Sequence, residues 1–197
     1  MAITLPANVA PGSPVTYEFY QQFIEPLAQA DNASGLTAHG TAVSNATTNT
    51  ALITVPAATI QSNAVAGSVF KLRAQLIISA PASAGATLAF NGYSGGSSGT
   101  ALATMTAFTP TASLSSALAD VEMWVNFYST TTAQCSVVAR ISSSTSTAAA
   151  AVYLAGSNSA TPVTVTVNSS LTLNAVMGSA VSGSTYEAIA AYWAQEA

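Results

Sequence analysis

Strict two-residue alternation of apolar and polar side chains is the strongest constraint on this chain, and it is clearest in VFKLRAQLIIS, residues 69–79. Every second residue from Phe70 to Ile78 is apolar, whereas Lys71, Arg73 and Gln75 share the opposite face. This period is typical of a β-strand with one face in a core. The same pattern recurs in DVEMWVNFYS, QCSVVARIS, TPVTVTV and SLTLNAVMG. The chain from about residue 50 onward is therefore expected to be all-β.

Weaker strands are expected near residues 50–55, 86–91, 101–108, 149–155 and 186–194, separated by turns rich in Gly, Ser, Asn and Pro. About eight to ten strands in this length suit a two-sheet antiparallel sandwich of jelly-roll-like type. No repeat of fixed period occurs, which disfavours a solenoid. We expect this β-sandwich domain to span residues 46–197.

The first 45 residues differ, because they predict one short helix followed by an extended arm. Ser13 and Pro14 form a helix start signal, and the helix is expected to run to about Gln29, with Pro26 disturbing its last turn. A polar, Gly-punctuated stretch follows. This arm could anchor the protein to a partner, or its helix could pack on its own domain. The candidate anchor residues are the apolar stripe of the helix: Tyr17, Phe19, Tyr20, Phe23, Ile24 and Leu27.

Charged residues are scarce, with three basic and seven acidic side chains among 197 residues. A nucleic-acid partner is not expected, because phosphate binding needs clustered Lys and Arg. No segment has the length of a membrane span or the form of a signal peptide, so we expect neither a membrane partner nor secretion. A neutral surface loses little on desolvation, which favours a structural protein that other chains cover.

Catalytic, metal and cofactor sites are not expected. The pattern G-x-S-x-G occurs twice between Gly92 and Gly99, but a strand follows it where a nucleophile elbow needs a helix. The only histidine, His39, precedes these serines, and together with the lone Cys135 it cannot form a metal cage. We interpret residues 92–100 as a mobile turn between two strands, and the chain as not an enzyme.

Several outward positions carry apolar or aromatic side chains, which predicts a second buried face and a homo-oligomer, most simply a trimer. The candidate interface residues are Trp124, Tyr128 and Trp193, provided that the last of these faces outward. Aromatic residues of this kind could instead bind a host glycan, although packing is the commoner role. The few charges fall on neighbouring strand faces, and we predict that Glu122 pairs with Lys71, Arg73 or Arg140.

The order of these segments resembles that of small virion proteins of tailed bacteriophages. The resemblance rests on PGSPVTYEFYQQFIEPLAQ, NTALITVPAATI, AGSVFKLRAQLIIS, TLAFNGYSGG, VEMWVNFYS and SSLTLNAVMGSA, and it covers most of the chain. It implies a non-enzymatic virion component, commonly trimeric, made in the host cytoplasm, with the arm bound to the particle. Two roles fit: a capsid decoration or minor capsid protein on the major capsid lattice, or a tail or fibre module that binds a receptor or glycan.

Overall fold

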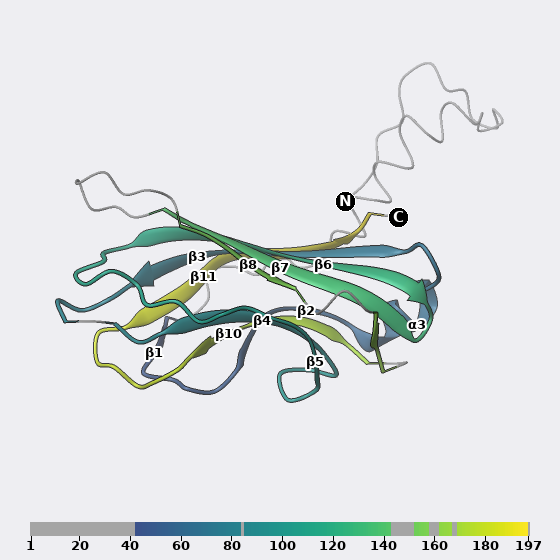
Figure 1. Ribbon diagram of the computed structural model, residues 1–197, viewed down its shortest axis with the longest axis horizontal. Coiled ribbons are helices and arrows are strands. Elements are labelled where there is room, and N and C mark those ends of the chain that lie inside the picture. Colours follow the sequence, from purple (N-terminus) through teal and green to yellow (C-terminus); the bar gives the residue numbers. More distant parts are fainter. Residues whose placement is uncertain (1–41, 84, 143–151, 158–161, 167–168, 197) are drawn as a thin grey trace, which may run out of the picture.

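Two antiparallel sheets stack face to face in the computed structural model of the protein (Figure 1). The structure describes residues 42–83, 85–142, 152–157, 162–166 and 169–196. The predicted helix of the first 45 residues and its candidate anchor residues Tyr17, Phe19, Tyr20, Phe23, Ile24 and Leu27 lie outside these ranges, as does His39. The predicted all-β, two-sheet antiparallel sandwich is confirmed.

The large sheet has the strand order β1-β11-β3-β6-β7-β8, with β9 also paired to β7, and the small sheet has the order β2-β10-β4-β5. The elements are β1 (Val43–Ser44), β2 (Thr50–Val55), α3 (Ala57–Asn63), β3 (Val69–Ser79), β4 (Leu88–Ser94), β5 (Thr100–Thr104), β6 (Ala117–Ser129), β7 (Thr132–Ser142), β8 (Val152–Ser157), β9 (Val163–Thr164), β10 (Leu171–Met177) and β11 (Thr185–Gln195). The first described strand, β1, thus lies within the last residues of the segment predicted as an arm.

Strand pairing is nested along the chain. The outermost described strands pair with each other, β1 with β11, and then β2 pairs with β10, β3 with β6 and β4 with β5. The pairs β1–β11 and β3–β6 belong to the large sheet, and the other two belong to the small sheet. Successive strands from β2 to β4 therefore alternate between the two layers, so that most of the core contacts join residues far apart in the sequence.

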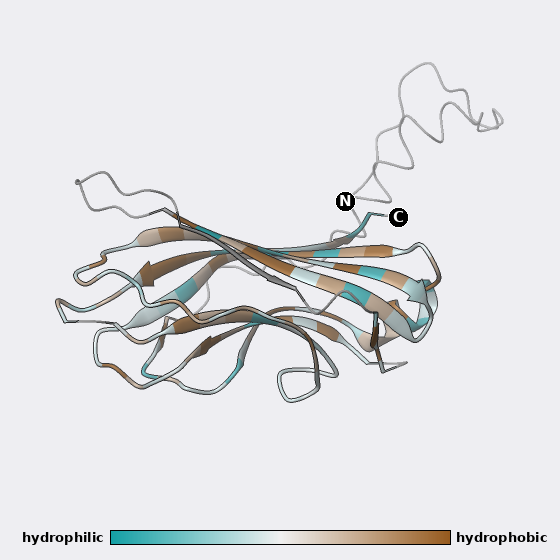
Figure 2. Cartoon of the chain, viewed as in Figure 1, coloured by the Kyte–Doolittle hydropathy of each residue, from teal (hydrophilic) through white to brown (hydrophobic). Residues whose placement is uncertain are grey.

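The core lies between the sheets, and the alternation in the sequence identified its side chains in the large sheet. Every inward residue expected in β3, β6 and β7 is buried. Figure 2 shows the corresponding bands of hydrophobic and hydrophilic residues along these strands. The buried set in the large sheet comprises Phe70, Leu72, Ala74, Leu76, Ile78, Val121, Met123, Val125, Phe127, Cys135, Val137, Ala139 and Ile141.

Two short elements differ from the expectation. TPVTVTV was expected to form a strand along its whole length, but only Val163–Thr164 pairs within the described residues, opposite Ala133 and Thr132 at the start of β7. The reason is that β8 already covers the same edge of β7 from Ser136 to Ile141. The helix α3 was not predicted, because it has seven residues and buries only Ile60, which leaves too little periodicity to recognise.

A β-bulge in β11 corrects the expected orientation of Trp193. The register with β3 shifts between Ala188 and Ala190, so Ile189 is the extra residue. Beyond the bulge the side chains change faces: Trp193 is 5% exposed in the core opposite Leu72. Trp193 therefore offers no surface to a partner, and the outward position next to it belongs to Tyr192.

Cys135 lies in this core, and its thiol is predicted to be unreactive in the folded protein. Burial raises the pKa of the thiol from 9.0 to about 12, which lowers the thiolate fraction near pH 8 on the order of a thousandfold. We expect a thiol reagent such as DTNB to leave the native chain unlabelled and to label one thiol per chain in guanidinium chloride. Rapid labelling without denaturant would contradict the buried position.

The same thiol makes stability fall at high pH. The unfolded chain loses the proton near pH 9, whereas the folded chain retains it until about pH 12. The contribution of Cys135 is therefore fully present below about pH 9 and is lost as the pH rises toward 12. Urea unfolding at pH 8 and pH 10.5 measures this loss. Cys135→Ala serves as the control and should show a smaller difference between the two conditions.

Candidate functional site on the outer face of the large sheet

Five charged side chains gather at the centre of the outer face of the large sheet. They are Lys71, Arg73, Asp120, Glu122 and Arg140, and only Glu187 and Glu196 carry further side-chain charges in the described part of the chain. Strand register brings them together, because β6 lies between β3 and β7 in the sheet. We call these five residues the charged patch.

The register of the paired strands also determines which of these side chains lie opposite each other. Arg73 of β3 lies opposite Glu122 of β6 on one side and opposite Tyr192 of β11 on the other. Asp120 lies opposite Arg140 of β7. Positions that are directly opposed across antiparallel strands have side chains within contact distance, so alternation and register together place opposite charges side by side.

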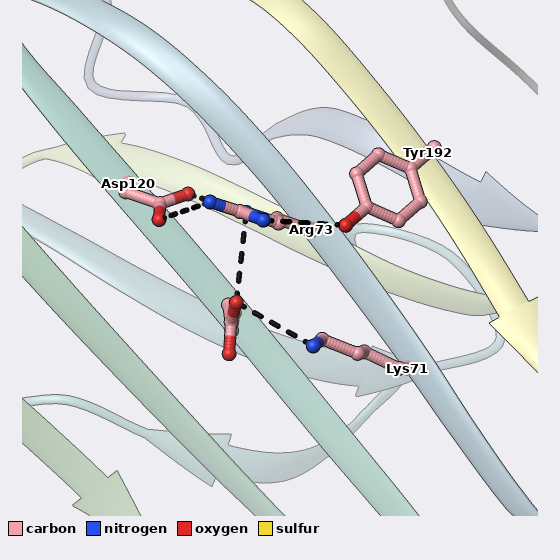
Figure 3. A network of polar contacts seen from close by, with 5 residues as sticks. Lys71, Arg73, Asp120 and Tyr192 are labelled. Carbon is pink, nitrogen blue, oxygen red and sulfur yellow. Dashed lines mark hydrogen bonds and ion pairs between the residues drawn. The ribbon is translucent and has the colours of Figure 1, made fainter. Parts of the chain in front are cut away.

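Arg73 is the centre of a hydrogen-bonded network that spans three strands (Figure 3). Its Nε and Nη2 atoms donate to Asp120 Oδ1 and Oδ2 at 2.7 and 2.6 Å, which is a bidentate ion pair. Its Nη1 atom donates to the Tyr192 hydroxyl at 3.4 Å. Glu122 Oε1 lies 3.5 Å from Arg73 Nε and 3.6 Å from Lys71 Nζ. The predicted pairing of Glu122 with Lys71 or Arg73 is confirmed.

The hydrogen bond to Asp120, and after it the one to Tyr192, raises the pKa of the Arg73 guanidinium above its ordinary value. Arginine is charged in either case, so the shift does not create an acid or a base. Each partner is roughly a quarter to a third exposed, with side-chain exposures of 30% for Arg73 and 24% for Asp120. The network therefore holds side chains in place more than it stabilises the fold.

Arg73→Lys is expected to lower the free energy of unfolding by about 1 kcal/mol or less, because lysine cannot form the bidentate pair and water screens what is lost. A double-mutant cycle of Arg73→Lys and Asp120→Asn, measured by urea unfolding at low and high salt, tests this. A coupling energy well above about 1 kcal/mol that is insensitive to salt would contradict a mainly positioning role.

A groove lies beside this network, between the outward side chains of β6 and β7. Its lining residues are Asp120, Glu122, Trp124, Val138 and Arg140. Lys71 Nζ lies 4.5 Å from the centroid of the Trp124 ring, so the ring takes part in a cation–π contact from the β3 side. The groove combines an aromatic ring, an aliphatic side chain, two carboxylates and a guanidinium.

Other aromatic side chains lie elsewhere. Tyr128 is 56% exposed near the end of β6, and its hydroxyl donates to Gln134 Oε1 at 2.9 Å. Tyr93 belongs to the small sheet, where its hydroxyl accepts a hydrogen bond from Asn49 Nδ2 at 3.1 Å. Of the aromatic residues predicted from the sequence, only Trp124 lines the groove. Tyr192 was missed because the bulge at Ile189 could not be read from the sequence.

The serine motif lies at the end of one strand and in the turn to the next. Gly92, Tyr93 and Ser94 belong to strand β4, and only residues 95–99 form the turn, so the expected turn is shorter than 92–100. A strand, β5, follows the turn, as predicted. Gly95 and Gly96 have φ values of 90° and 83°, which suits glycine in a tight turn.

Within the ranges that the structure describes, no group of three or more His, Cys, Asp or Glu side chains could hold a metal ion. No described helix has both the length and the hydropathy needed to cross a membrane.

Comparison with known proteins adds no identification. No family model, no curated protein and no solved structure matches the chain. The resemblance to phage virion proteins therefore stays a prediction, and the interpretation of function rests on the chain's own residues.

Proposed function

We propose that the chain is a non-enzymatic structural protein of a bacteriophage virion, a capsid decoration or minor capsid protein that binds the major capsid lattice as a homotrimer. The observation that carries the proposal is the distribution of charge. Five of the seven charged side chains in the described residues lie in the charged patch, and four of these, the patch without Arg140, are joined by the ion pairs given above.

The uneven distribution of charge leaves the outer face of the small sheet suited to contact with other chains. The exposed positions of this face lie on the edge strands and are short and uncharged, among them Ala51 and Thr54 of β2 and Ala101 and Thr104 of β5, whereas the central strands β4 and β10 are largely buried. Short neutral side chains lose little conformational entropy and little hydration when another chain covers them. Such a face suits repeated contact with copies of the same chain or with a capsid lattice.

Nested pairing supports the finer description of the fold within this proposal. In a jelly roll the outermost strands of the chain pair with each other, each further pair lies inside the previous one along the sequence, and the pairs form two packed sheets. The pairs β1–β11, β2–β10, β3–β6 and β4–β5 follow this order. Jelly rolls are common in viral capsid proteins, and we infer that this sandwich is of the same type.

Sedimentation equilibrium of the purified full-length chain tests the oligomer. We expect a species of about 59 kDa, three times the chain mass of 19.7 kDa. Thr54→Lys and Thr104→Glu place charges on the neutral outer face of the small sheet and should shift the equilibrium toward the monomer. Gln75→Lys, on the large sheet, is the matched control. A wild-type chain that stays monomeric at high micromolar concentration would remove the support for the trimer.

The location of the protein on a purified virion tests the role. Immunogold labelling or cryo-electron microscopy is expected to place it at regular sites on the capsid shell. A chain lacking residues 1–41, which keeps every described strand, is expected to fold but not to co-sediment with capsids. Labelling confined to the tail would replace the decoration role with the alternative of a tail or fibre module that binds a receptor or glycan.

A further inference from the structure

The groove beside the charged patch has features that the role of a capsid protein does not require. It is two strands wide, because Glu122 lies opposite Val138 and Asp120 lies opposite Arg140 in the register of β6 and β7. Trp124, the next outward residue of β6, closes one end of this array. Along the groove, Trp124 forms an apolar end, Glu122 and Val138 lie in the middle, and Asp120 and Arg140 form the polar end.

The Trp124 ring is held in place as a platform. Lys71 approaches the ring from β3, and the groove lies toward β7, on the opposite side of β6. The contact with the Lys71 ammonium restrains the ring from the β3 side, and Trp124 also lines the groove between β6 and β7. A rigid aromatic surface of this kind binds flat, weakly polar faces of ligands at a low entropic cost.

The polar end is held in place as well. Both oxygens of Asp120 accept hydrogen bonds from Arg73, and Glu122 Oε1 lies near both Arg73 and Lys71. These contacts restrict the rotamers of the two carboxylates that line the groove. Carboxylate oxygens accept hydrogen bonds and the guanidinium of Arg140, an exposed residue, donates them, so the groove presents both kinds of partner, with the two carboxylates restrained.

Charge in the patch is nearly balanced, with three cations and two carboxylates. An anionic ligand would meet Asp120 and Glu122, and a cationic ligand would meet Arg140. A neutral ligand whose groups both donate and accept hydrogen bonds, and which also has an apolar face, fits this arrangement best. A pyranose ring has these properties: its hydroxyl groups donate and accept, and its C–H groups form an apolar face that can stack on an aromatic ring.

We propose that this groove binds one pyranose ring of a neutral glycan. Trp124 is the stacking platform, Val138 extends the apolar contact, and Asp120, Glu122 and Arg140 hydrogen-bond to the ring hydroxyls. The proposal does not depend on where the protein lies in a virion, and it goes beyond the capsid role by assigning a ligand class to a particular face.

Intrinsic fluorescence gives a direct test, because the chain has two tryptophans and Trp193 is buried in the core. The full-length protein is titrated to about 10 mM, well above a millimolar Kd, with neutral oligosaccharides built of glucose, galactose, mannose, rhamnose and N-acetylglucosamine. At least one is expected to change the emission saturably. Glucuronic and sialic acid oligosaccharides are the charged comparison and are expected to bind more weakly.

Variants identify the site, with saturation-transfer NMR as the readout where the tryptophan is removed. Trp124→Ala is expected to weaken binding of the best neutral glycan at least about tenfold, and Trp124→Phe less, because a smaller aromatic platform remains. Glu122→Gln should also weaken it. Tyr128→Ala, an exposed aromatic of the same strand outside the groove, is the matched control and should bind like the wild type.

Three results would overturn the proposal. They are the absence of binding by every neutral glycan in the panel, binding that Trp124→Ala leaves unchanged, and a Trp124→Ala variant that sediments as a monomer while the wild type is an oligomer. The last result would mean that a second copy of the chain covers the groove. None of them bears on the capsid location, which immunogold labelling tests separately.

Discussion

Phe70→Ala is expected to lower the free energy of unfolding by about 3–5 kcal/mol. The Phe70 side chain is fully buried in β3 and packs edge to face against Phe127, with ring centroids 5.8 Å apart and an interplanar angle of 76°. Truncation removes the aromatic contact and leaves a cavity between the sheets. This loss is a large share of the roughly 5–15 kcal/mol by which domains of this kind are stable.

Urea unfolding followed by circular dichroism measures the effect, and Phe70→Leu gives a second reading if the alanine variant does not fold. The leucine variant keeps most of the volume and should lose less, about 1–2 kcal/mol. Tyr128→Ala is the matched control, since that side chain is 56% exposed, and it should change stability by no more than about 0.5 kcal/mol. Equal losses in Phe70→Ala and Tyr128→Ala would contradict the assignment of the core.

Alternation predicted the long strands well because β3, β6 and β7 are each buried on one face only. In such a strand the two-residue period records directly which side chains meet the core. It also predicted the charged patch, because residues on the outward face of neighbouring strands are close once the strands pair. The ion pair of Glu122 with Lys71 and Arg73 follows from these two facts.

Alternation did not predict the orientation of side chains beyond a register shift, nor features that depend on how neighbouring strands pair. The bulge at Ile189 inverts the second half of β11, so Trp193 enters the core and Tyr192 reaches Arg73. Nothing in TYEAIAAYWAQ marks that position, because alanine fits either face. The groove was not predicted either, because it depends on the register that sets Glu122 opposite Val138 and Asp120 opposite Arg140.

Central strands of the small sheet show a third kind of limit. In β4 and β10, side chains on both faces are largely buried, including Asn91, Thr172 and Asn174. From the sequence alone, a polar residue in such a strand is predicted to face outward and to be exposed to solvent. Asn174 is fully buried, and among the residues that the structure describes neither its Oδ1 nor its Nδ2 has a hydrogen-bond partner. Burial of these polar residues is set by the tertiary packing around the sheet, which the alternation of residues in the sequence does not show.

Gly92 was predicted to lie in the turn 92–100, but it belongs to strand β4. It is central to the packing of that strand. It lies between Leu173 and Ala103 in the small sheet. A Cβ atom at this position would come within 2.7 Å of Met123 Cε and 3.2 Å of Cys135 Sγ, both from the large sheet. The absence of a side chain at this position lets the two sheets approach.

Gly92→Ala is therefore expected to lower the free energy of unfolding by about 1–3 kcal/mol, and Gly92→Val by more, through overpacking. Since the nearest atoms belong to the flexible end of Met123, shortening that side chain should relieve the clash. The double variant Gly92→Ala with Met123→Val is expected to lose clearly less than the sum of the single losses. Asn126→Val, at an exposed position of β6 outside the face proposed to contact other copies, is the control and should change stability by about 0.5 kcal/mol or less. Strictly additive losses in the double variant would show that Gly92 does not face Met123, and the packing of the two sheets described above would then be wrong at its centre.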